Sequence, residues 1–264
     1  MMDEEIVSVG YDAVYKAMPK SPTLRRLWRE HACGLDFPEE FAHISFVTLP
    51  ELRRIETELR LTPDDTFVDL GCGMAGPALW MARETGARLT GVDLSAVAVS
   101  LAGERAASLG LGDAPEFRVG SFASTGLPDG SADAAMSEDA LQYAPDKRAA
   151  MAEAARVLRP GARFVFTAFE LAPERVRDLP VIGADPVDDY RPVLDDAGFS
   201  IDAYDEIPGW PEPMTAAYSA LVAADEALRA EMGDLAVNAL FGEITMTLEQ
   251  RPYRRRVLAV ATRR

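Results

Sequence analysis

At 264 residues and 48% hydrophobic content, the chain is long enough for one large α/β domain with an appended lid. No apolar run approaches the roughly 18 residues that span a bilayer, which argues against a membrane protein. With 43 acidic against 27 basic residues the formal net charge is -16, and this field would repel phosphate backbones and anionic lipid surfaces. We therefore expect neither nucleic acid nor membrane among its partners.

The amino terminus and the cysteines indicate a soluble, cytoplasmic protein. The first five residues, Met-Met-Asp-Glu-Glu, lack the basic start of a secretory signal. The sequence holds two cysteines, and Cys72 lies inside a glycine turn where a disulfide would obstruct the backbone, so Cys33 and Cys72 are both expected to be free thiols. The basic run at residues 251–256 is interpreted as a solvated face.

The first 60 residues have mostly helical patterns and are predicted to lie outside the main sheet. Strand-like runs then alternate with helical patterns, which predicts a parallel sheet; the runs are residues 66–70, 88–93, 116–120, 132–136 and 163–169. Three helices are predicted between them from residues that typically start and end helices. The first runs from Pro77 to Gly86, the second from Ser95 to Gly110, and the third from Asp146 to the Arg159-Pro160-Gly161 turn.

The pattern is less regular after the fifth strand. Residues 187–197 are predicted as a helix ending at Gly198, residues 199–204 as a sixth strand and residues 256–261 as a seventh. Residues 210–250 are longer than a usual connection and have helical stretches at 218–232 and 235–247, which predicts a lid or partner surface. We expect a helical cap at 1–60, an α/β core at 61–207, a helical lid at 208–250 and the last core strand at 251–264.

The segment from Asp69 to Gly76 places a Gly-x-Gly-x-x-Gly pattern between a predicted strand and a predicted helix. Its glycines permit a tight turn and a close approach of the backbone to a ligand, and the N–H groups of the helix favour a polar or anionic group. Ordinary strand-to-helix turns show the same pattern. Asp93, however, ends the next strand, 24 residues after Asp69, where a carboxylate can accept both hydroxyls of a ribose. Together the two features predict a ligand that contains a nucleoside.

Three segments resemble motifs of the class I S-adenosylmethionine-dependent methyltransferases: residues 68–73 (Val-Asp-Leu-Gly-Cys-Gly), 91–95 (Gly-Val-Asp-Leu-Ser) and 158–161 (Leu-Arg-Pro-Gly). The resemblance implies a Rossmann-like, seven-stranded, mostly parallel sheet flanked by helices, with S-adenosyl-L-methionine as the methyl donor. It also implies a site for this donor. The methionine moiety would contact Asp69, Gly71, Cys72, Gly73 and Gly76. The ribose and adenine would lie beside Asp93 and Leu94, and the adenine would also contact Ser121 and Phe122. Many relatives have an acidic residue in place of Ser121, but a serine hydroxyl can accept the same hydrogen bond.

Two alternatives to a methyltransferase remain. A nicotinamide-dependent oxidoreductase shares the glycine turn and the ribose acid, and Tyr143 and Lys147 match a Tyr-x-x-x-Lys pair. We interpret this match as accidental, because Pro145 would break the helix that must carry both residues and Asp146 is a typical helix cap. The second alternative is a protein of this fold that binds S-adenosylmethionine but catalyses a non-methylation reaction or acts as a scaffold.

Methyl transfer from a sulfonium requires an acceptor held in near-attack geometry, and a phenol, alcohol or ammonium acceptor must also lose a proton. The candidate catalytic residues are His31 and His43 in the N-terminal segment, and Glu138, Asp139 and Tyr143 after the fourth strand, at the edge where open α/β sheets bind ligands. The histidines and the acids could instead have purely structural roles. Both histidines lie in apolar patterns that are typical of packed histidines, and Glu138 or Asp139 could serve only to orient a loop.

Some of these residues are also expected at the donor. Glu138 and Tyr15 are predicted to contact it, and Tyr11 with Tyr15 could close over it, as N-terminal tyrosines do in similar small-molecule methyltransferases. No metal is predicted.

The predicted lid mixes acids such as Asp225 and Glu243 with apolar residues, which are Trp210, Met214, Tyr218, Leu221, Phe241 and Met246. This composition predicts a mainly apolar pocket for a small, partly hydrophobic acceptor such as a natural-product intermediate. The same face could equally form the contact of a homodimer.

Overall fold

The computed structural model describes residues 4–111, 115–177, 179 and 185–264. In these ranges seven strands form one sheet in the order β3-β2-β1-β4-β5-β7-β6. The strands are β1 Thr66–Leu70, β2 Arg88–Asp93, β3 Glu116–Val119, β4 Ala132–Glu138, β5 Leu158–Leu171, β6 Phe199–Glu206 and β7 Arg254–Arg263. Neighbours from β3 to β5 are parallel, whereas β7 is antiparallel to β5 and β6. The seven predicted strands and the mostly parallel α/β fold are confirmed.

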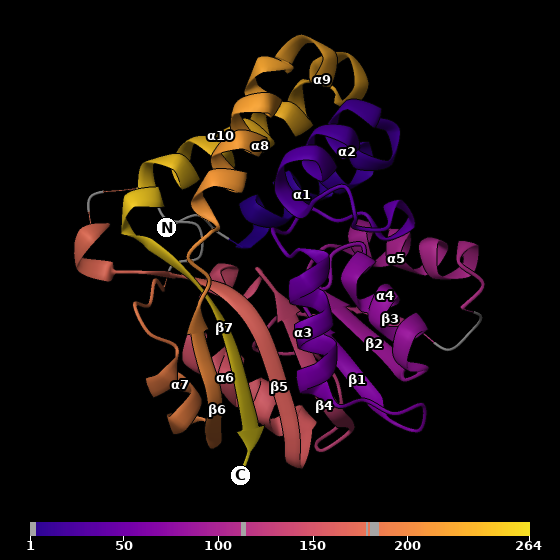
Figure 1. The fold of residues 1–264 in the computed structure, drawn as a ribbon, viewed down its shortest axis with the longest axis vertical. Helices are drawn as coiled ribbons and strands as arrows, with labels where there is room; N and C mark the ends of the chain where they lie inside the picture. The colour runs from indigo at the N-terminus through magenta and orange to yellow at the C-terminus, as the bar shows by residue number, and fades with distance from the viewer. Residues whose placement is uncertain (1–3, 112–114, 178, 180–184) are drawn as a thin grey trace.

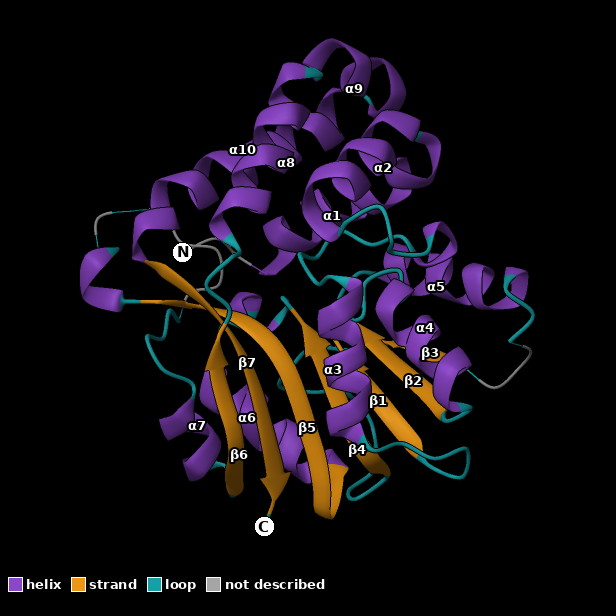
Figure 2. Ribbon diagram, viewed as in Figure 1, coloured by secondary structure: helices purple, strands orange, loops and turns teal. Residues whose placement is uncertain are grey.

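Helices cover both faces of the sheet (Figure 2). One face packs against α3 Leu49–Leu59, α4 Gly76–Thr85 and α5 Ala96–Ser108, and the other against α6 Lys147–Val157 and α7 Arg191–Asp196. Successive strand residues alternate between the two cores, so that Phe67 belongs to the first and Val68 to the second. Both faces are therefore apolar, which is why these strands appear in the sequence as continuous apolar runs.

The predicted helix caps are present. Ser95 Oγ accepts a hydrogen bond from the backbone N–H of Ala98 at 3.0 Å, and Asp146 Oδ1 accepts one from Ala149 at 2.8 Å. Gly86 ends α4 in the left-handed conformation, with φ 73°. Each helix therefore begins and ends close to where its capping residues predict.

Two predicted boundaries were wrong. The helix expected at 187–197 begins only at Arg191, because the carbonyl of Val187 accepts a bond from Leu171 N at 2.7 Å and the N–H of Tyr190 donates to Tyr204 Oη at 2.9 Å. The turn expected at residues 159–161 lies within β5, at a register shift in its pairing with β4. In both places the backbone pairs with distant residues, which a local pattern does not reveal.

The basic run at residues 251–256 is not a uniformly solvated face, contrary to the prediction. Successive residues of β7 point to opposite sides of the sheet. Arg256 is 1% exposed and Arg254 lines an internal cavity, whereas Arg255 is exposed and pairs with Glu170 at 2.7 Å. The run therefore supplies buried charges to the interior.

The remaining helices form a roof above the carboxyl ends of the parallel strands and the amino end of β7 (Figure 1). They come from two segments that are distant in sequence. The N-terminal segment contains α1 Glu4–Ala17, α2 Pro22–Trp28 and the short π-helical segment η2 Arg29–Cys33. The second segment contains α8 Pro211–Ala223, α9 Asp225–Met232 and α10 Asp234–Gln250. Glu231 joins them, since its carboxylate accepts bonds from Ser21 Oγ at 2.5 Å and Thr23 Oγ1 at 2.7 Å. Residues 1–3 of the expected cap lie outside the described residues, and α3 of that segment packs on the sheet.

No helix in the described ranges combines the length and the apolar composition that a membrane span requires.

Candidate active site

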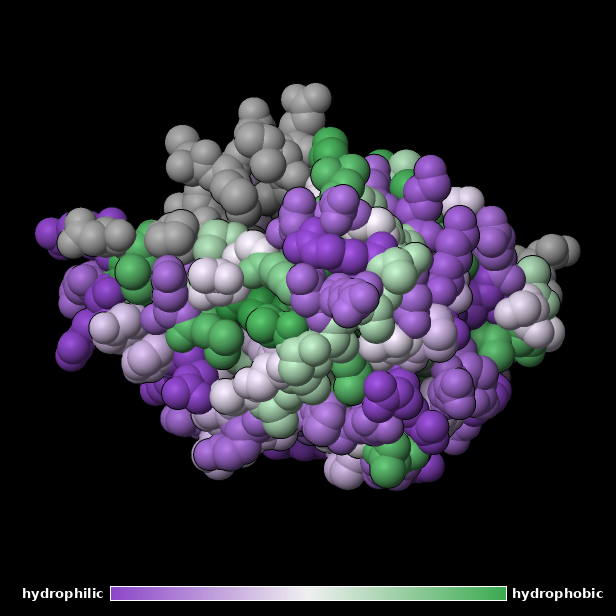
Figure 3. Space-filling view, turned by 90° about the horizontal axis from the view of Figure 1, so that it is seen from above, coloured by the Kyte–Doolittle hydropathy of each residue, from purple (hydrophilic) through white to green (hydrophobic). Residues whose placement is uncertain are grey.

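A cavity of about 640 Å³ lies between the carboxyl ends of the strands and the roof helices. This volume is within the range of small-molecule sites in proteins. The floor comes from the turns after β1, β2 and β4, and the roof mainly from α1, α8 and α10. Seen from above, apolar side chains gather near the middle of the roof, with charged residues around them (Figure 3). Val9 and Leu235, which are 54% and 66% exposed, are among the residues that line the cavity.

The glycine turn after β1 forms a close-fitting cradle. Gly71 and Gly73 have φ values of 77° and 52°, which disfavour residues with side chains. A Cβ atom on Gly73 would lie 2.8 Å from Tyr15 Oη, and one on Gly71 would lie 2.8 Å from the Phe122 ring. The turn therefore lies directly beneath two aromatic side chains.

The third glycine of the pattern has a different role. Gly76 is the first residue of α4, and a Cβ atom there would lie 2.2 Å from the carbonyl oxygen of Phe41. Its lack of a side chain lets the N-terminal segment cross the start of the helix. Gly76 lines the cavity, but packing already requires a glycine at this position.

Asp93, at the end of β2, reaches back to the glycine turn. Its Oδ2 accepts a hydrogen bond from Gly73 N at 2.7 Å and its Oδ1 accepts one from Ser95 N at 2.8 Å. Each carboxylate oxygen has a second lone pair, so both can still accept a ribose hydroxyl. Ser95 Oγ in turn donates to Asp12 of α1, which joins the roof to this corner of the floor.

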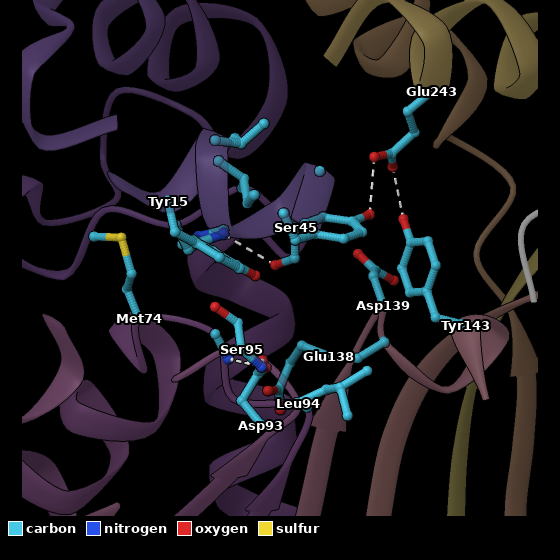
Figure 4. A pocket seen from close by; sticks show the side chains of 18 of the residues that line it. Tyr15, Ser45, Met74, Asp93, Leu94, Ser95, Glu138, Asp139, Tyr143 and Glu243 are labelled. Atoms are coloured by element: carbon cyan, nitrogen blue, oxygen red, sulfur yellow. Dashed lines mark hydrogen bonds between the residues drawn. The ribbon is translucent and has the colours of Figure 1, made fainter. Parts of the chain in front are cut away.

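Two buried carboxyl groups face the methionine end of the proposed donor site. Asp69 Oδ1 and Glu138 Oε1 have no hydrogen-bond partner among the described residues. Burial raises the pKa of both groups, and the pKa is raised further by Asp93 for Asp69 and by Asp69 for Glu138. Buried acids without a cationic partner are costly, so this end of the cavity suits a ligand that carries positive charge. Figure 4 shows Glu138 on the floor beside Asp93 and Leu94.

The residues expected at the adenine also line the cavity. Leu94 is partly exposed at the end of β2, and Ser121 and Phe122 follow β3, where the backbone of Ser121 pairs with that of Ser124. Cys72 lines the cavity too, and both cysteines are free and buried, as predicted.

Asp139, predicted as a catalytic candidate, lines the cavity, and both of its carboxylate oxygens accept hydrogen bonds from protein groups. Arg256 donates to it through Nε at 2.8 Å and through a second nitrogen at 3.1 Å, and Phe46 N donates to Oδ2 at 2.8 Å. Asp139 also has a left-handed backbone, with φ 51°. This arrangement is that of an acid that orients a loop.

The structure separates the two histidines. His43 lines the cavity, with Nδ1 2.9 Å from Ser45 Oγ and with Nε2 lacking a partner among the described residues. Burial lowers the pKa of His43 to about 3, so the ring is neutral near pH 7. His31 is half-buried on η2 and is not among the residues that line the cavity. The structure therefore does not bring His31 to the site.

Tyr143 and Lys147 do not form an oxidoreductase pair. Tyr143 ends the short helix η4 Leu141–Tyr143, and its hydroxyl donates to Glu243 Oε1 at 2.7 Å. Lys147 begins α6, and its Nζ donates to the carbonyl of Ala144 at 2.6 Å. The two residues therefore lie on different helices with different partners, and the Tyr-x-x-x-Lys match is accidental.

Part of the predicted lid composition reaches the cavity. Met214, Tyr218 and Met246 line it, whereas Trp210, Leu221, Phe241 and Asp225 do not. The sequence analysis gave Glu243 no role of its own, although this acid stands in an otherwise apolar helix segment. Glu243 bonds to both Tyr143 and Tyr11. Arg254, which also lines the cavity, was missed because the basic run was assigned to the surface.

The sheet order, the glycine turn and the acid at the end of β2 define a Rossmann-like domain that holds a nucleoside-containing ligand at the carboxyl edge of its strands. Residues 68–166 match the family described as "Methyltransferase domain". The chain is 28% identical to 27-O-demethylrifamycin SV methyltransferase of Amycolatopsis mediterranei over 78% of each chain. It is 35% identical to a probable tocopherol O-methyltransferase of Oryza sativa over 53% of this chain, but spans only 41% of that protein.

Two solved structures share the fold. The [4+2]-cyclase SpnF superposes with a TM-score of 0.75 at 21% identity, covering 98% of this chain and 95% of its own. Geranyl diphosphate C-methyltransferase from Streptomyces coelicolor, in complex with geranyl diphosphate and S-adenosyl-L-homocysteine, gives 0.59 at 21% identity, over 81% and 79% of the two chains. The matched methyltransferase domain and these relatives support a class I S-adenosylmethionine-dependent methyltransferase, with S-adenosyl-L-methionine as the methyl donor.

Proposed function

We propose that this chain methylates a hydroxyl oxygen of a small, mainly apolar metabolite. The observation that carries the proposal is that the donor floor and an apolar acceptor wall line the same cavity of about 640 Å³. Donor and acceptor held in one cavity can reach the near-attack geometry that supplies about 7–11 kcal/mol of the barrier.

The floor fits the donor. S-adenosylmethionine, when bound, supplies an activated methyl group on a cationic sulfur. We assign Asp93 to the ribose and the unpartnered carboxyls of Asp69 and Glu138 to the positive charge of the methionine moiety. Leu94 and Phe122 pack against the adenine, and Tyr15 covers the glycine turn and excludes water.

The roof fits an apolar acceptor. Its half of the cavity is lined mainly by aromatic and aliphatic side chains, including Trp28, Phe46, Phe169, Met214, Tyr218 and Ile244. We assign the neutral ring of His43, which lines the cavity and whose Nδ1 bonds to Ser45, to the wall beside the reactive hydroxyl. The low pKa of His43 makes it a weak base, so positioning supplies most of the acceleration.

Transfer to oxygen is favoured by two of the relatives. The rifamycin enzyme matches over 78% of both chains, and it and the rice tocopherol protein are named for O-methyl transfer. By contrast, a sterol 24-C-methyltransferase matches over only 39% of this chain. The longer match includes roof segments as well as the donor floor. Because the Amycolatopsis relative is named for a rifamycin substrate, we place this chain in natural-product biosynthesis as well.

The test is transfer of labelled methyl from S-adenosylmethionine to acceptors that share one skeleton, namely 2-naphthol, 2-naphthylamine and 2-naphthoate. We expect the label on the oxygen of 2-naphthol. Label on the amine instead, or none on any hydroxyl in a broader set of apolar phenols and alcohols, would overturn the proposal. Because the same fold serves a protein named a cyclase, conversion of an acceptor without release of S-adenosylhomocysteine would indicate a non-methylation reaction.

Two further expectations remain proposals. The exposed side chains of Val222 on α8 and Leu235 on α10 support a homodimer through the lid, which light scattering at micromolar concentration tests directly. The free buried thiols Cys33 and Cys72 support a reducing, cytoplasmic location.

A further inference from the structure

Glu243 brings a carboxylate into the mainly apolar acceptor half of the cavity. It lies on α10, and its two oxygens accept hydrogen bonds from two phenols on different elements (Figure 4). Tyr143 Oη of η4 lies 2.7 Å from Glu243 Oε1, and Tyr11 Oη of α1 lies 2.8 Å from Oε2. One carboxylate therefore links the cap, the lid and the loop after β4.

The two phenols orient Glu243 without saturating it. A carboxylate oxygen has two lone pairs, and each oxygen of Glu243 uses one for a tyrosine. Glu243 lines the cavity and is only partly buried, so the free lone pairs are accessible from the acceptor side. A side chain that served only to pin the roof would gain more from apolar packing than from a carboxylate taken out of water.

The cluster lies close to the donor turn. The rings of Tyr143 and Tyr11 are 5.6 Å apart, those of Tyr11 and Tyr15 are 5.9 Å apart, and Tyr15 covers Gly73. An aromatic path of three rings therefore leads from the glycine turn to Glu243. An acceptor whose apolar body lies along this path places one end at the donor and its polar end at Glu243.

The charges around Glu243 select among polar groups. Arg254 also lines the cavity and interacts electrostatically with Glu243, while its guanidinium donates to Gln250 Oε1 at 3.2 Å. Burial raises the pKa of Glu243, whereas the bonds from Tyr143 and Tyr11 and the charge of Arg254 favour its ionised form. The opposite charges of Glu243 and Arg254 offset each other, so the pair gives little net attraction for either an anionic or a cationic acceptor. A neutral hydrogen-bond donor needs no net charge to bind the free lone pairs of Glu243.

We propose that Glu243 anchors a neutral hydroxyl group of the acceptor, at the end away from the hydroxyl that is methylated, and that Tyr11 and Tyr143 are positioning residues that hold its carboxylate in place. This inference rests on the proposed function, in that the ligand bound beside the donor is the methyl acceptor. It adds the chemical class that the cavity selects, which is an apolar alcohol or phenol without a formal charge.

The experiment measures binding of three probes of equal shape, namely 2-naphthol, naphthalene and 2-naphthoate, to the full chain saturated with S-adenosylhomocysteine. The wild type should bind 2-naphthol about tenfold more tightly than naphthalene, as expected for a hydrogen bond to a charged group, and should bind 2-naphthoate least. Glu243→Gln should reduce the preference for 2-naphthol to about threefold or less and should bind 2-naphthoate more tightly than the wild type does. A gain of binding for one probe cannot come from a misfolded variant.

The matched control is Glu249→Gln, the same substitution on an exposed side chain of the same helix. It should leave the probe preferences unchanged, and both variants should bind S-adenosylhomocysteine like the wild type. Tyr11→Phe and Tyr143→Phe should each weaken binding of 2-naphthol by a smaller factor, because the carboxylate stays but is less well oriented.

The inference is overturned if the wild type shows no preference for 2-naphthol over naphthalene, or if Glu243→Gln leaves that preference intact. Its failure differs from failure of the proposed function. If the wild type methylates a hydroxyl and Glu243→Gln keeps the same preference for 2-naphthol, the role proposed for Glu243 is wrong and the proposed O-methylation is retained. If Glu243→Gln loses the preference for 2-naphthol but the wild type methylates no hydroxyl, the role proposed for Glu243 is supported and the proposed O-methylation is wrong.

Discussion

The guanidinium Nε of Arg256 on β7 lies 2.8 Å from Oδ1 of Asp139, and both side chains are buried. Arg256 also pairs with Glu51 at 2.6 Å, and Glu51 completes the capping box that begins α3. Asp139 in turn accepts a bond from Phe46 N, which fixes a loop at the cavity wall. One buried cation thus sets the positions of a helix start, a strand end and a loop.

Replacement of Asp139 by Ala should destabilise the fold and spare the donor site. Removing one partner of a buried ion pair typically costs about 3–5 kcal/mol, and because Arg256 keeps Glu51 we expect the lower end, about 3 kcal/mol. Urea unfolding at pH 7 measures this loss. Asp205→Ala, which breaks an exposed pair with Arg54, is the control and should cost less than about 1 kcal/mol. A stable Asp139→Ala variant without methyl transfer would instead place Asp139 in the chemistry.

Asp93→Ala should weaken binding of S-adenosylhomocysteine by more than tenfold. The substitution removes the assigned ribose acceptor and also the two bonds that hold the backbone at Gly73 and Ser95. Titration calorimetry gives the dissociation constant. Asp64→Ala changes an exposed acid before the amino end of β1 and should have no effect. Unchanged affinity in Asp93→Ala would refute the ribose assignment.

The buried acid Asp69 should make the free protein less stable as pH rises. Burial and the charge of Asp93 raise the pKa of Asp69 in the folded chain above its usual value of 3.8. Between that usual value and the raised pKa of the folded chain, the folded chain keeps a proton that the unfolded chain has lost. The free energy of unfolding therefore declines as the pH rises through this window.

Asp69→Asn removes this titration. We expect a melting temperature at pH 7.5 that is higher by roughly 2–4 °C, together with at least tenfold weaker donor binding. Thermal melts between pH 4 and pH 8, with and without S-adenosylmethionine, measure both effects. A variant with a lower melting temperature than the wild type at pH 7.5 would contradict the destabilisation that we assign to the buried carboxyl group of Asp69.

Tyr15 should contribute to donor binding through its ring more than through its hydroxyl. Tyr15→Phe keeps the ring over Gly73 and should change the affinity for S-adenosylhomocysteine by less than about threefold. Tyr15→Ala uncovers the glycine turn and should weaken binding by about tenfold or more. Tyr253→Ala, at an exposed tyrosine, is the control. Equal loss in the Phe and Ala variants would assign the effect to the hydroxyl instead.

The floor of the site was predictable because it is local in sequence. The glycine turn, Asp93 and the residues after β3 and β4 each follow a strand, and the carboxyl ends of parallel strands meet at one edge. Strand and helix positions were predictable for a similar reason, since apolar runs and capping residues report on their immediate neighbours.

The roof depends on pairs that no local pattern contains. Tyr11 and Glu243 are 232 positions apart, and Asp139 and Arg256 are 117 apart. For the same reason the sequence could not rank His31 and His43, because both lie in apolar patterns and only the fold brings His43 to the cavity. Arg256 in a basic run is typical of the surface, and its buried position follows from the alternation of β7 beside Asp139.

The lid leaves and rejoins the core at nearly one point. Glu206 pairs with Val257 across β6 and β7, and Ile207 N donates to the carbonyl of Arg256 at 2.7 Å. The three lid helices are therefore an excursion between adjacent strand ends, and their replacement leaves the sheet pairing unbroken. We expect that relatives can differ in this segment while keeping the same sheet, provided that the exchanged helices still meet the N-terminal helices to which Glu231 and Glu243 now bond.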